Sequence, residues 1–439
     1  MDSQPPTADR AFALPVVTRA VVISQLLFSA GNVLTTGGFL YYYANAFGPS
    51  AFQFSLLLIL PELAETAGLF ARPVAARVGS RKRTWLACLL MGRMFALGVP
   101  LMSLPVITTG VEWPFESIIG WVAFWYVLQG IAYACFISWL TDLAPQTNWG
   151  RLFARRKLAM LAIMIVVPVV AGQLRSRWAN TLPENEKLVT YVSIFLIGNG
   201  LVMASVLPLL KLPDVTSDSP ELISRSAWQA FRDSFVDPSL RWMLLHGWWL
   251  SFAQGLTQSA LFRYQVNVLH IPVETYYALN GLMLLIQMPL TTLAGRLSDR
   301  GFDKPTLFWG VTAVSGAMLF WLIATPDRWW LLAGAYVVWG LFGFVNICGR
   351  NLLLKLSPLS DNTMQVALFR QVGGLFAAFA GLLGGIWLDR MTGSNTSLVL
   401  AGFVLSPFQI IFLTSFLGRL TAGLWVLPIR RPRGAADPG

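Results

Sequence analysis

The chain is poor in the residues on which most enzymes and metal sites depend. Its 439 residues include only two histidines, His246 and His270, and neither has a carboxylate at a catalytic or HExxH-like spacing. Its three cysteines, Cys88, Cys135 and Cys348, all fall inside apolar runs, which excludes a disulfide framework and a CxxC metal knuckle. We therefore expect no enzyme activity, no metal and no cofactor, and we expect the cysteines and His246 to be packing residues.

Charge is scarce as well. Charged residues make up 12 % of the chain, against about 25 % in an ordinary soluble domain. Apolar residues make up 55 %, and the mean hydropathy is +0.60. Because so little polar surface cannot cover a soluble protein, the composition predicts a protein of the lipid bilayer. The net charge of +11 does not indicate nucleic-acid binding, since Lys and Arg cluster in short connections between apolar runs.

Twelve apolar runs are long enough to cross a membrane, for which roughly 20 residues are needed. They predict an all-α polytopic membrane protein with helices at 17–46, 50–72, 84–107, 117–143, 156–175, 188–210, 241–268, 275–297, 305–325, 329–354, 363–388 and 397–424. Basic residues fill the loops after the second, fourth, eighth and tenth runs and are absent from those after the first, third and seventh. By the positive-inside rule, the even-numbered loops and both termini are cytoplasmic. The first run is too long for a cleavable signal.

The longest connection follows the sixth run and divides the chain into six helices plus six. Within it, apolar positions 227, 228, 231 and 235 have helical spacing and predict a short amphipathic helix on the membrane surface. The expected parts are a tail, a six-helix bundle, a linker, a second six-helix bundle and a second tail, at 1–16, 17–210, 211–240, 241–424 and 425–439.

Two short basic loops, at 72–83 and 295–304, lie at matching places in the two halves and look like copies. A repeat of this kind is typical of a duplicated membrane bundle, and such bundles are typical of transporters. In the first loop the basic residues are Arg72, Arg77, Arg81, Lys82 and Arg83, and in the second they are Arg296, Arg300 and Lys304.

Six plus six helices, a long middle loop and this repeated loop resemble the major facilitator superfamily of secondary transporters, whose loop reads Gly-x-Leu-Ala-Asp-Arg-x-Gly-Arg-Lys. The second copy matches at Gly295, Leu297, Asp299 and Arg300, with the closing basic residue displaced to Lys304. The first copy keeps Arg77, Gly79, Arg81 and Lys82, but has Arg72 in the opening Gly position and Ala76 in place of Asp. The resemblance implies two pseudo-symmetric six-helix bundles, working as a monomer in the cell inner membrane of a bacterium.

The connection after the fourth helix, with Asp142, Pro145, Arg151, Arg155 and Arg156, is similar to a second motif of many bacterial members. In the family these loops form a latch that closes the cytoplasmic side, and a carboxylate at a helix C-terminus, such as Asp142, needs a nearby cation; Arg77 is the expected one. The predicted latch comprises Arg77, Gly79, Arg81, Asp142, Arg151, Arg155, Gly295, Asp299, Arg300 and Arg370. The alternative is that the basic loops only fix orientation and bind anionic headgroups.

Three charged residues are expected at membrane depth, where each needs a physical reason. Glu62 and Arg93 lie at matching depth on consecutive helices, so an ion pair is expected, with Glu65 one turn away to share the cation. Two interpretations are open. The pair holds two helices together, or one glutamate takes up and releases a proton during transport, because burial and like-charge repulsion favour its neutral form.

In the family, helices one, four, seven and ten line the central cavity. The candidate cavity residues are Asn32, Tyr41, Trp125, Gln129, Tyr133, Gln254, Gln258, Arg263, Trp339 and Asn346. Uncharged hydrogen-bonding groups mixed with aromatic rings suit a neutral or weakly charged organic solute. Arg263 either binds an anionic group of the solute or reaches the membrane interface. The glycines of the eleventh run, by contrast, predict a close-packing surface.

The function expected from these features is secondary active transport of a small organic solute, coupled to protons, by rocking of the two bundles. The alternative is a transporter-like receptor or assembly factor without solute flux, which the missing Asp of the first loop slightly favours. The expected partners are the solute, protons and the lipid bilayer, and nucleic acid is excluded.

Overall fold

The computed structural model describes residues 14–103, 105, 114–143, 149–214, 232, 235–357, 362–394, 397–400 and 403–430. Within these residues, eleven helices are long and apolar enough to cross a membrane. The prediction of an all-α polytopic membrane protein is therefore confirmed. The short amphipathic helix predicted around 227–235 falls mostly outside the described residues.

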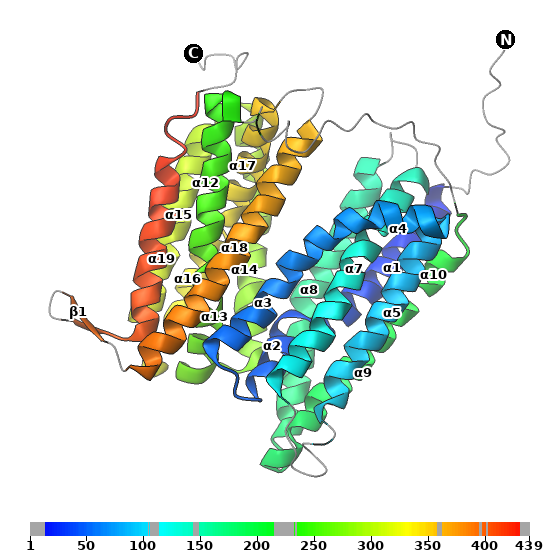
Figure 1. Cartoon of the computed structure of the whole chain (residues 1–439), viewed down its shortest axis with the longest axis horizontal. Helices are drawn as coiled ribbons and strands as arrows, with labels where there is room; N and C mark the ends of the chain where they lie inside the picture. The colour runs from blue at the N-terminus through cyan, green and yellow to red at the C-terminus, as the bar shows by residue number, and fades with distance from the viewer. Residues whose placement is uncertain are drawn as a thin grey trace. The chain divides into compact units, whose positions relative to one another are not determined.

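The helical segments follow the predicted order (Figure 1). Those of the first half are α1 (Leu14–Thr35), α2 (Gly37–Asn45), α3 (Ala51–Ala67), η2 (Gly68–Phe70), α4 (Ala71–Val78), α5 (Arg81–Leu101), α7 (Phe115–Leu143), α8 (Trp149–Ala179), η4 (Glu184–Glu186), α9 (Leu188–Ala204) and α10 (Leu207–Leu210). Those of the second half are α12 (Pro238–Gly255), α13 (Gln258–Arg263), η5 (Tyr264–Val268), α14 (Val273–Asp299), α15 (Asp303–Ile323), η6 (Pro326–Arg328), α16 (Leu331–Trp339), α17 (Phe342–Leu356), α18 (Asn362–Gly393) and α19 (Pro407–Leu424).

Several predicted helices are divided in the structure: 17–46 into α1 and α2, 50–72 into α3, η2 and α4, and 329–354 into α16 and α17. Two further runs differ more. The run at 241–268 is divided into α12, α13 and η5, and the break follows Gly255, a residue of low helix propensity. The run at 397–424 begins instead with an antiparallel pair of strands, β1 (Leu398–Leu400) and β2 (Phe403–Leu405). Its helix starts only at Pro407, because the Ser406 side chain accepts a hydrogen bond from the N–H of Gln409 in a capping box.

The chain divides into two compact units. The first comprises Met1–Tyr43 and Ala64–Ser219, and the second comprises Ala44–Leu63 and Pro220–Gly439. In the first unit, α5 packs on α7, and α1 packs on α8 and α9. In the second, α12 packs on α18, and α15 packs on α17 and α19, which Figure 1 shows side by side. The bundle boundaries expected from the sequence stay a prediction.

The first part of α3 belongs to the second unit because it is anchored on α18. The N–H groups of Ala51 and Phe52 donate to the Asp389 carboxylate at 2.7 and 2.8 Å. The positive end of the α3 helix dipole also stabilises a carboxylate at this position. One turn further, a side chain at Gly385 would meet Ser55 at 2.3 Å.

Four glycines of α18 lie in close contact with neighbouring segments, as the predicted close-packing surface requires, and Gly384 and Gly385 have no room for a side chain. A Cβ atom at Gly384 would lie 2.0 Å from the Leu256 carbonyl oxygen, and one at Gly373 would lie 3.2 Å from the Ser251 hydroxyl. Gly255 of α12 makes the reciprocal approach, since its Cβ would lie 2.2 Å from the Ala377 carbonyl oxygen. Small residues let the two helix backbones pack directly on each other.

The two basic loops are structural counterparts. Gly79 and Gly301 both adopt positive φ, 76° and 79°, which a glycine tolerates at no steric cost. Three residues after each glycine, a lysine donates to two carbonyl groups at the end of the last helix of its own half. Lys82 Nζ lies 2.8 and 2.6 Å from the oxygens of Leu210 and Leu212, and Lys304 Nζ lies 2.7 and 2.6 Å from those of Leu427 and Ile429.

A second repeated contact links the helix before each loop, α4 or α14, to the corresponding later helix, α7 or α17. The Cys135 thiol lies 3.7 Å from the Ala71 carbonyl oxygen, and the Cys348 thiol lies 3.8 Å from that of Ala294. All three cysteines are buried, as expected for packing residues. Four matching positions in the two halves support the inference that the chain arose by duplication.

Candidate functional site

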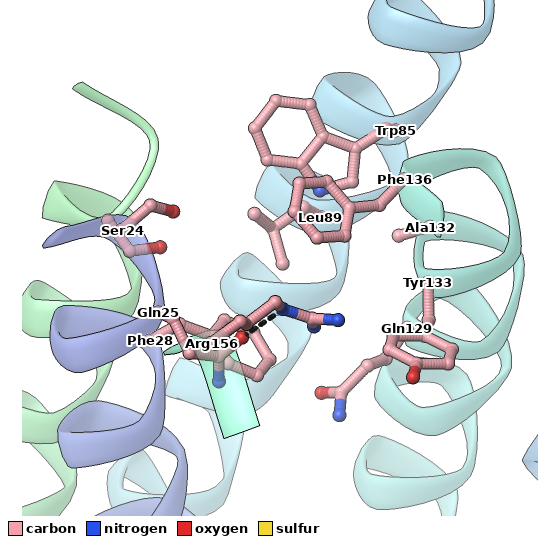
Figure 2. Close-up of a pocket in the computed structure, with 11 residues that line it drawn as sticks. Ser24, Gln25, Phe28, Trp85, Leu89, Gln129, Ala132, Tyr133, Phe136 and Arg156 are labelled. Carbon is pink, nitrogen blue, oxygen red and sulfur yellow. Dashed lines mark hydrogen bonds between the residues drawn. The ribbon is translucent and has the colours of Figure 1, made fainter. Parts of the chain in front are cut away.

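A cavity of about 210 Å³ lies within the first unit, between α1, α5, α7 and α8 (Figure 2). Two of the residues that line it, Gln129 and Tyr133, were candidates from the sequence. The full lining comprises Ser24, Gln25, Phe28, Trp85, Leu89, Gln129, Ala132, Tyr133, Phe136, Arg156 and Ser205. The lining thus combines a wall of aromatic and aliphatic side chains with a small number of polar groups, as in a typical ligand pocket.

Arg156 supplies the positive charge of this cavity. Because α8 begins at Trp149, Arg156 lies roughly two turns inside the helix and not in the basic loop to which the sequence pattern assigned it. Its Nε donates to Gln25 Oε1 at 2.5 Å, and its guanidinium carbon lies 5.2 Å from the centre of the Phe136 ring. Tyr133 lines the same cavity. Figure 2 shows the two Nη atoms directed from Gln25 toward the Gln129 side of the cavity.

Gln129 is held from behind by two donors. Its Oε1 accepts from Arg93 Nη2 at 3.1 Å and from Trp125 Nε1 at 2.9 Å. Because both partners are donors, the amide oxygen must face them, and the amide NH2 group makes no hydrogen bond to them. On the opposite wall, both ends of the Gln25 amide are occupied. Its Oε1 accepts from Arg156 Nε, and its Nε2 donates to Ser29 Oγ at 2.7 Å.

Arg93 is almost completely buried, with 1 % of its surface exposed. Its other hydrogen bonds go to Thr35 Oγ1 at 3.1 Å and Asn32 Oδ1 at 3.0 Å, and the guanidinium lies over the Trp125 ring at 4.9 Å. These partners are all uncharged.

The candidate proton groups lie on α3. Glu62 is half-buried in the second unit, and a Cβ at Gly374 of α18 would lie 3.5 Å from its Oε2. The Glu65 side chain lies outside the described part of the structure. The pairing of Glu62 with Arg93 stays a prediction.

Each of the remaining cavity candidates of the second unit has its own contacts in the part that the structure describes. Arg263 Nη1 donates to the Pro49 carbonyl at 2.7 Å, and Gln258 Oε1 would meet a Cβ at Gly381 at 3.5 Å. Trp339 packs on Trp321 and Tyr336, whereas Gln254 is half-buried and Asn346 is exposed. In the first unit, Tyr41 is half-buried on α2.

The predicted latch residues lie at helix ends or near them. Gly79 caps α4, Arg81 begins α5, and Gly295 and Asp299 are in the last turns of α14. The exposed members are Arg77, Gly79, Arg155, Asp299, Arg300 and Arg370. The Asp142 and Arg151 side chains lie outside the described part.

Several contacts near these loops were missed from the sequence. Lys355 Nζ lies 2.6 Å from Asp303 Oδ2 and 2.8 Å from the Ser298 carbonyl oxygen. In the first half, the Ser80 hydroxyl donates to Asp214 at 2.5 Å. The available signal was the position of Ser80 and Asp303 within two residues of the loop glycines, in loops already identified as copies.

Other polar residues inside the helices have structural partners. His246 Nδ1 lies 2.8 Å from the Ala422 carbonyl oxygen, which agrees with a packing role. The Arg419 guanidinium bonds to the Ser415 and Thr257 hydroxyls, each at 3.0 Å, and so holds the break after α12. Within the described residues, no group of three or more His, Cys, Asp or Glu side chains could hold a metal ion.

Comparison with known proteins places the chain among membrane carriers. The sequence profile described as Major Facilitator Superfamily matches residues 21–370. No significant match is found among curated protein sequences. Among solved structures, a bacterial homologue of the iron transporter ferroportin has a TM-score of 0.68 at 15 % identity, over 95 % of this chain and 99 % of that one.

Two further structures are similar to the chain. The nucleoside transporter NupG has a TM-score of 0.64 at 13 % identity, over 95 % of this chain and 99 % of that one. A D-xylose-proton symporter has a TM-score of 0.64 at 16 % identity, over 96 % and 99 %. At these identities the likeness shows a shared fold.

Proposed function

The chain belongs to the major facilitator superfamily and is a multi-pass membrane transporter; we propose that it is a secondary active carrier of a small organic solute, driven by protons. Its two halves rock against each other and open the binding site alternately to either side of the membrane. It works as a monomer in the cell inner membrane, with both termini in the cytoplasm.

The observation that carries this proposal is the cavity of the first unit. It is lined from α1, α5, α7 and α8, it holds convergent polar groups, and it is set in helices that span the membrane. A few fixed polar groups in an otherwise apolar pocket are what a binding site for a small organic molecule requires. Structures of the same fold include carriers of a nucleoside and of D-xylose with a proton.

Glu62 is the proposed proton carrier. It follows Pro61 in the middle of α3, where a carboxylate is costly and its protonation state is sensitive to a neighbouring charge. Its side chain lies beside Gly374 of α18, where a Cβ would come within 3.5 Å of Oε2. A change in the packing of α3 on α18 would therefore change the environment of the carboxylate, which is the property that proton coupling needs.

The latch is proposed at the repeated loops. Lys355 and Asp303 form an ion pair at 2.6 Å. Because Lys82 corresponds to Lys304, the residues just before them, Arg81 and Asp303, correspond as well. Because Cys135 corresponds to Cys348, the residues seven positions later, Asp142 and Lys355, also correspond. We therefore expect Arg81, in place of Arg77, to pair with Asp142, with the two charges exchanged between the halves.

The experiment compares wild type with Glu62→Gln in proteoliposomes, after a thermal-stability screen of the purified protein has identified a solute. Wild type is expected to accumulate the solute when a pH gradient is imposed. Glu62→Gln is expected to lose accumulation and to keep exchange of solute across the membrane, because the amide binds no proton in this pH range. Glu184→Gln, at an exposed residue outside the spanning helices, is the control.

Unchanged accumulation by Glu62→Gln would remove this residue from the coupling mechanism, and Glu65→Gln would then be measured. A solute that binds to wild type without exchange or accumulation would contradict the carrier function itself and favour a receptor.

A further inference from the structure

We infer that the cavity of the first unit binds an organic anion, with the anionic group on Arg156 and the apolar body against the aromatic wall. The inference rests on the proposed carrier function and names the solute class for the same site. The sequence predicted a neutral or weakly charged organic solute. Of these classes, the inference selects a small anion with one planar acidic group, such as an aromatic carboxylate.

The cavity carries a positive charge from Arg156. Among the described residues that line it, Arg156 is the single charged one and none is a carboxylate. The ion pairs that the structure describes are Arg83 with Asp214, Lys187 with Glu184 and Lys355 with Asp303, none of which includes Arg156. A guanidinium at this depth is costly without an opposite charge, so an anionic solute would be stabilised by entering.

A second arginine adds to this field. Arg93 stands directly behind Gln129 and has hydrogen bonds to uncharged oxygens only, in the part of the chain that the structure describes. Because it is 1 % exposed, water screens its charge poorly. The two guanidinium groups therefore raise the potential of the cavity together, which attracts an anion and repels a cation.

The hydrogen-bonding groups that face the cavity are mainly donors. The amide oxygens of Gln25 and Gln129 are both turned toward arginines and are satisfied there. The amide and guanidinium donors offered to a ligand are the NH2 group of Gln129 and the Nη groups of Arg156, and Figure 2 shows the Nη atoms directed toward the Gln129 side of the cavity. A planar carboxylate accepts two parallel bonds from a guanidinium and one more from an amide.

The apolar wall sets the size and shape of the rest of the ligand. Trp85 and Phe136 lie with their ring centres 5.3 Å apart, and Phe28 and Leu89 complete the wall. The cavity holds about 210 Å³. Since a cavity of about 150 Å³ in another protein accommodates benzene, there is room here for one ring and one acidic group.

The test is a binding titration of the full-length purified protein with benzoate, alongside its neutral analogue benzamide and its cationic analogue benzylamine. Benzoate is expected to bind at least about 10-fold more tightly than either analogue, since hydrogen bonds to a charged group are the stronger ones. Arg156→Gln is expected to weaken benzoate binding by about 10-fold or more and to leave benzamide binding unchanged. Gln129→Leu, which keeps both arginines, is expected to weaken it less.

The matched control is Arg175→Gln. Arg175 is also on α8, also bonds a neutral oxygen, Thr190 Oγ1 at 3.2 Å, and also stacks on a ring, Tyr191 at 4.0 Å, but it lies outside the cavity lining. This variant is expected to bind benzoate as wild type does. Equal affinities for benzoate and benzamide, or unchanged benzoate binding in Arg156→Gln, would overturn the inference.

If Arg156→Gln does not fold, Gln25→Glu decides the question. This variant keeps Arg156 and gives it a permanent carboxylate partner at the position of Gln25 Oε1, so benzoate binding is expected to be lost. Unchanged binding would overturn the inference.

Transport then separates the inference from the proposed function. Benzoate binding that depends on Arg156 but produces no flux would uphold the anion site and contradict the carrier. Flux of a neutral solute that Arg156→Gln leaves unchanged, with no benzoate binding, would uphold the carrier and overturn the anion site.

Discussion

At the scale of single residues, the sequence predicted the cavity in part. Gln129 and Tyr133 were identified because they lie on an apolar run that lines the cavity throughout the family. Arg156 was assigned to a loop, because the start of its helix was placed at the first apolar residues, whereas α8 begins at Trp149. Arg93 was expected at membrane depth beside Glu62, whereas its hydrogen bonds to Thr35, Asn32 and Gln129 depend on side-chain orientation, which periodicity does not encode.

Lys82 and Lys304 give a prediction at this scale. Lys82 bonds the carbonyl oxygens of Leu210 and Leu212 at the end of α10, and Lys304 bonds those of Leu427 and Ile429 in the turns that follow α19. A cation near a helix C-terminus also offsets the helix dipole. Lys82→Met and Lys304→Met are each expected to lower stability by roughly 1 kcal/mol, discounted for partial exposure. The measurement is the Tm of the purified protein in detergent. Lys211→Met, an exposed lysine next to the same helix end, is the control, and an equal loss in that variant would contradict the capping role.

At the scale of elements, the order and the type of the helices could be predicted, but the start of α19 and the break after Gly255 could not. A hydropathy window treats 397–424 as one run, whereas the capping box at Ser406 starts the helix later. The break after Gly255 was also missed, because its cause is tertiary. Gly255 and Gly384 pack the backbones of α12 and α18 together, and Arg419 binds the Thr257 hydroxyl.

The close packing of α12 on α18 gives a prediction with opposite signs at two glycines. Gly384→Ala is expected to destabilise the protein by about 1 to 3 kcal/mol, because the new methyl group would meet the Leu256 carbonyl oxygen at 2.0 Å. Gly316→Ala, on α15 with open space around the new methyl group, is expected to be neutral or to stabilise by up to about 1 kcal/mol. Thermal melts of the two variants measure the difference. Equal effects would contradict direct backbone packing at Gly384.

At the scale of the whole molecule, the duplication was the most predictable feature, because two loops with glycine and lysine at the same spacing stand at matching places. The structure adds contacts that the motif alone does not contain: the lysines that cap the last helix of each half, and the thiols of Cys135 and Cys348 against equivalent carbonyl groups. The ion pair of Asp303 with Lys355 was hidden, because the family motif contains neither residue.

The carrier account depends on both halves entering the membrane in the same orientation, and cysteine labelling measures this directly. Single cysteines are placed at Val78, Arg300, Thr181 and Asp327, all exposed, after the three buried native cysteines are replaced by alanine. With a membrane-impermeant maleimide, positions 78 and 300 are expected to react only from the cytoplasmic face, and positions 181 and 327 only from the opposite face. Reaction of positions 78 and 300 from opposite faces would contradict the account.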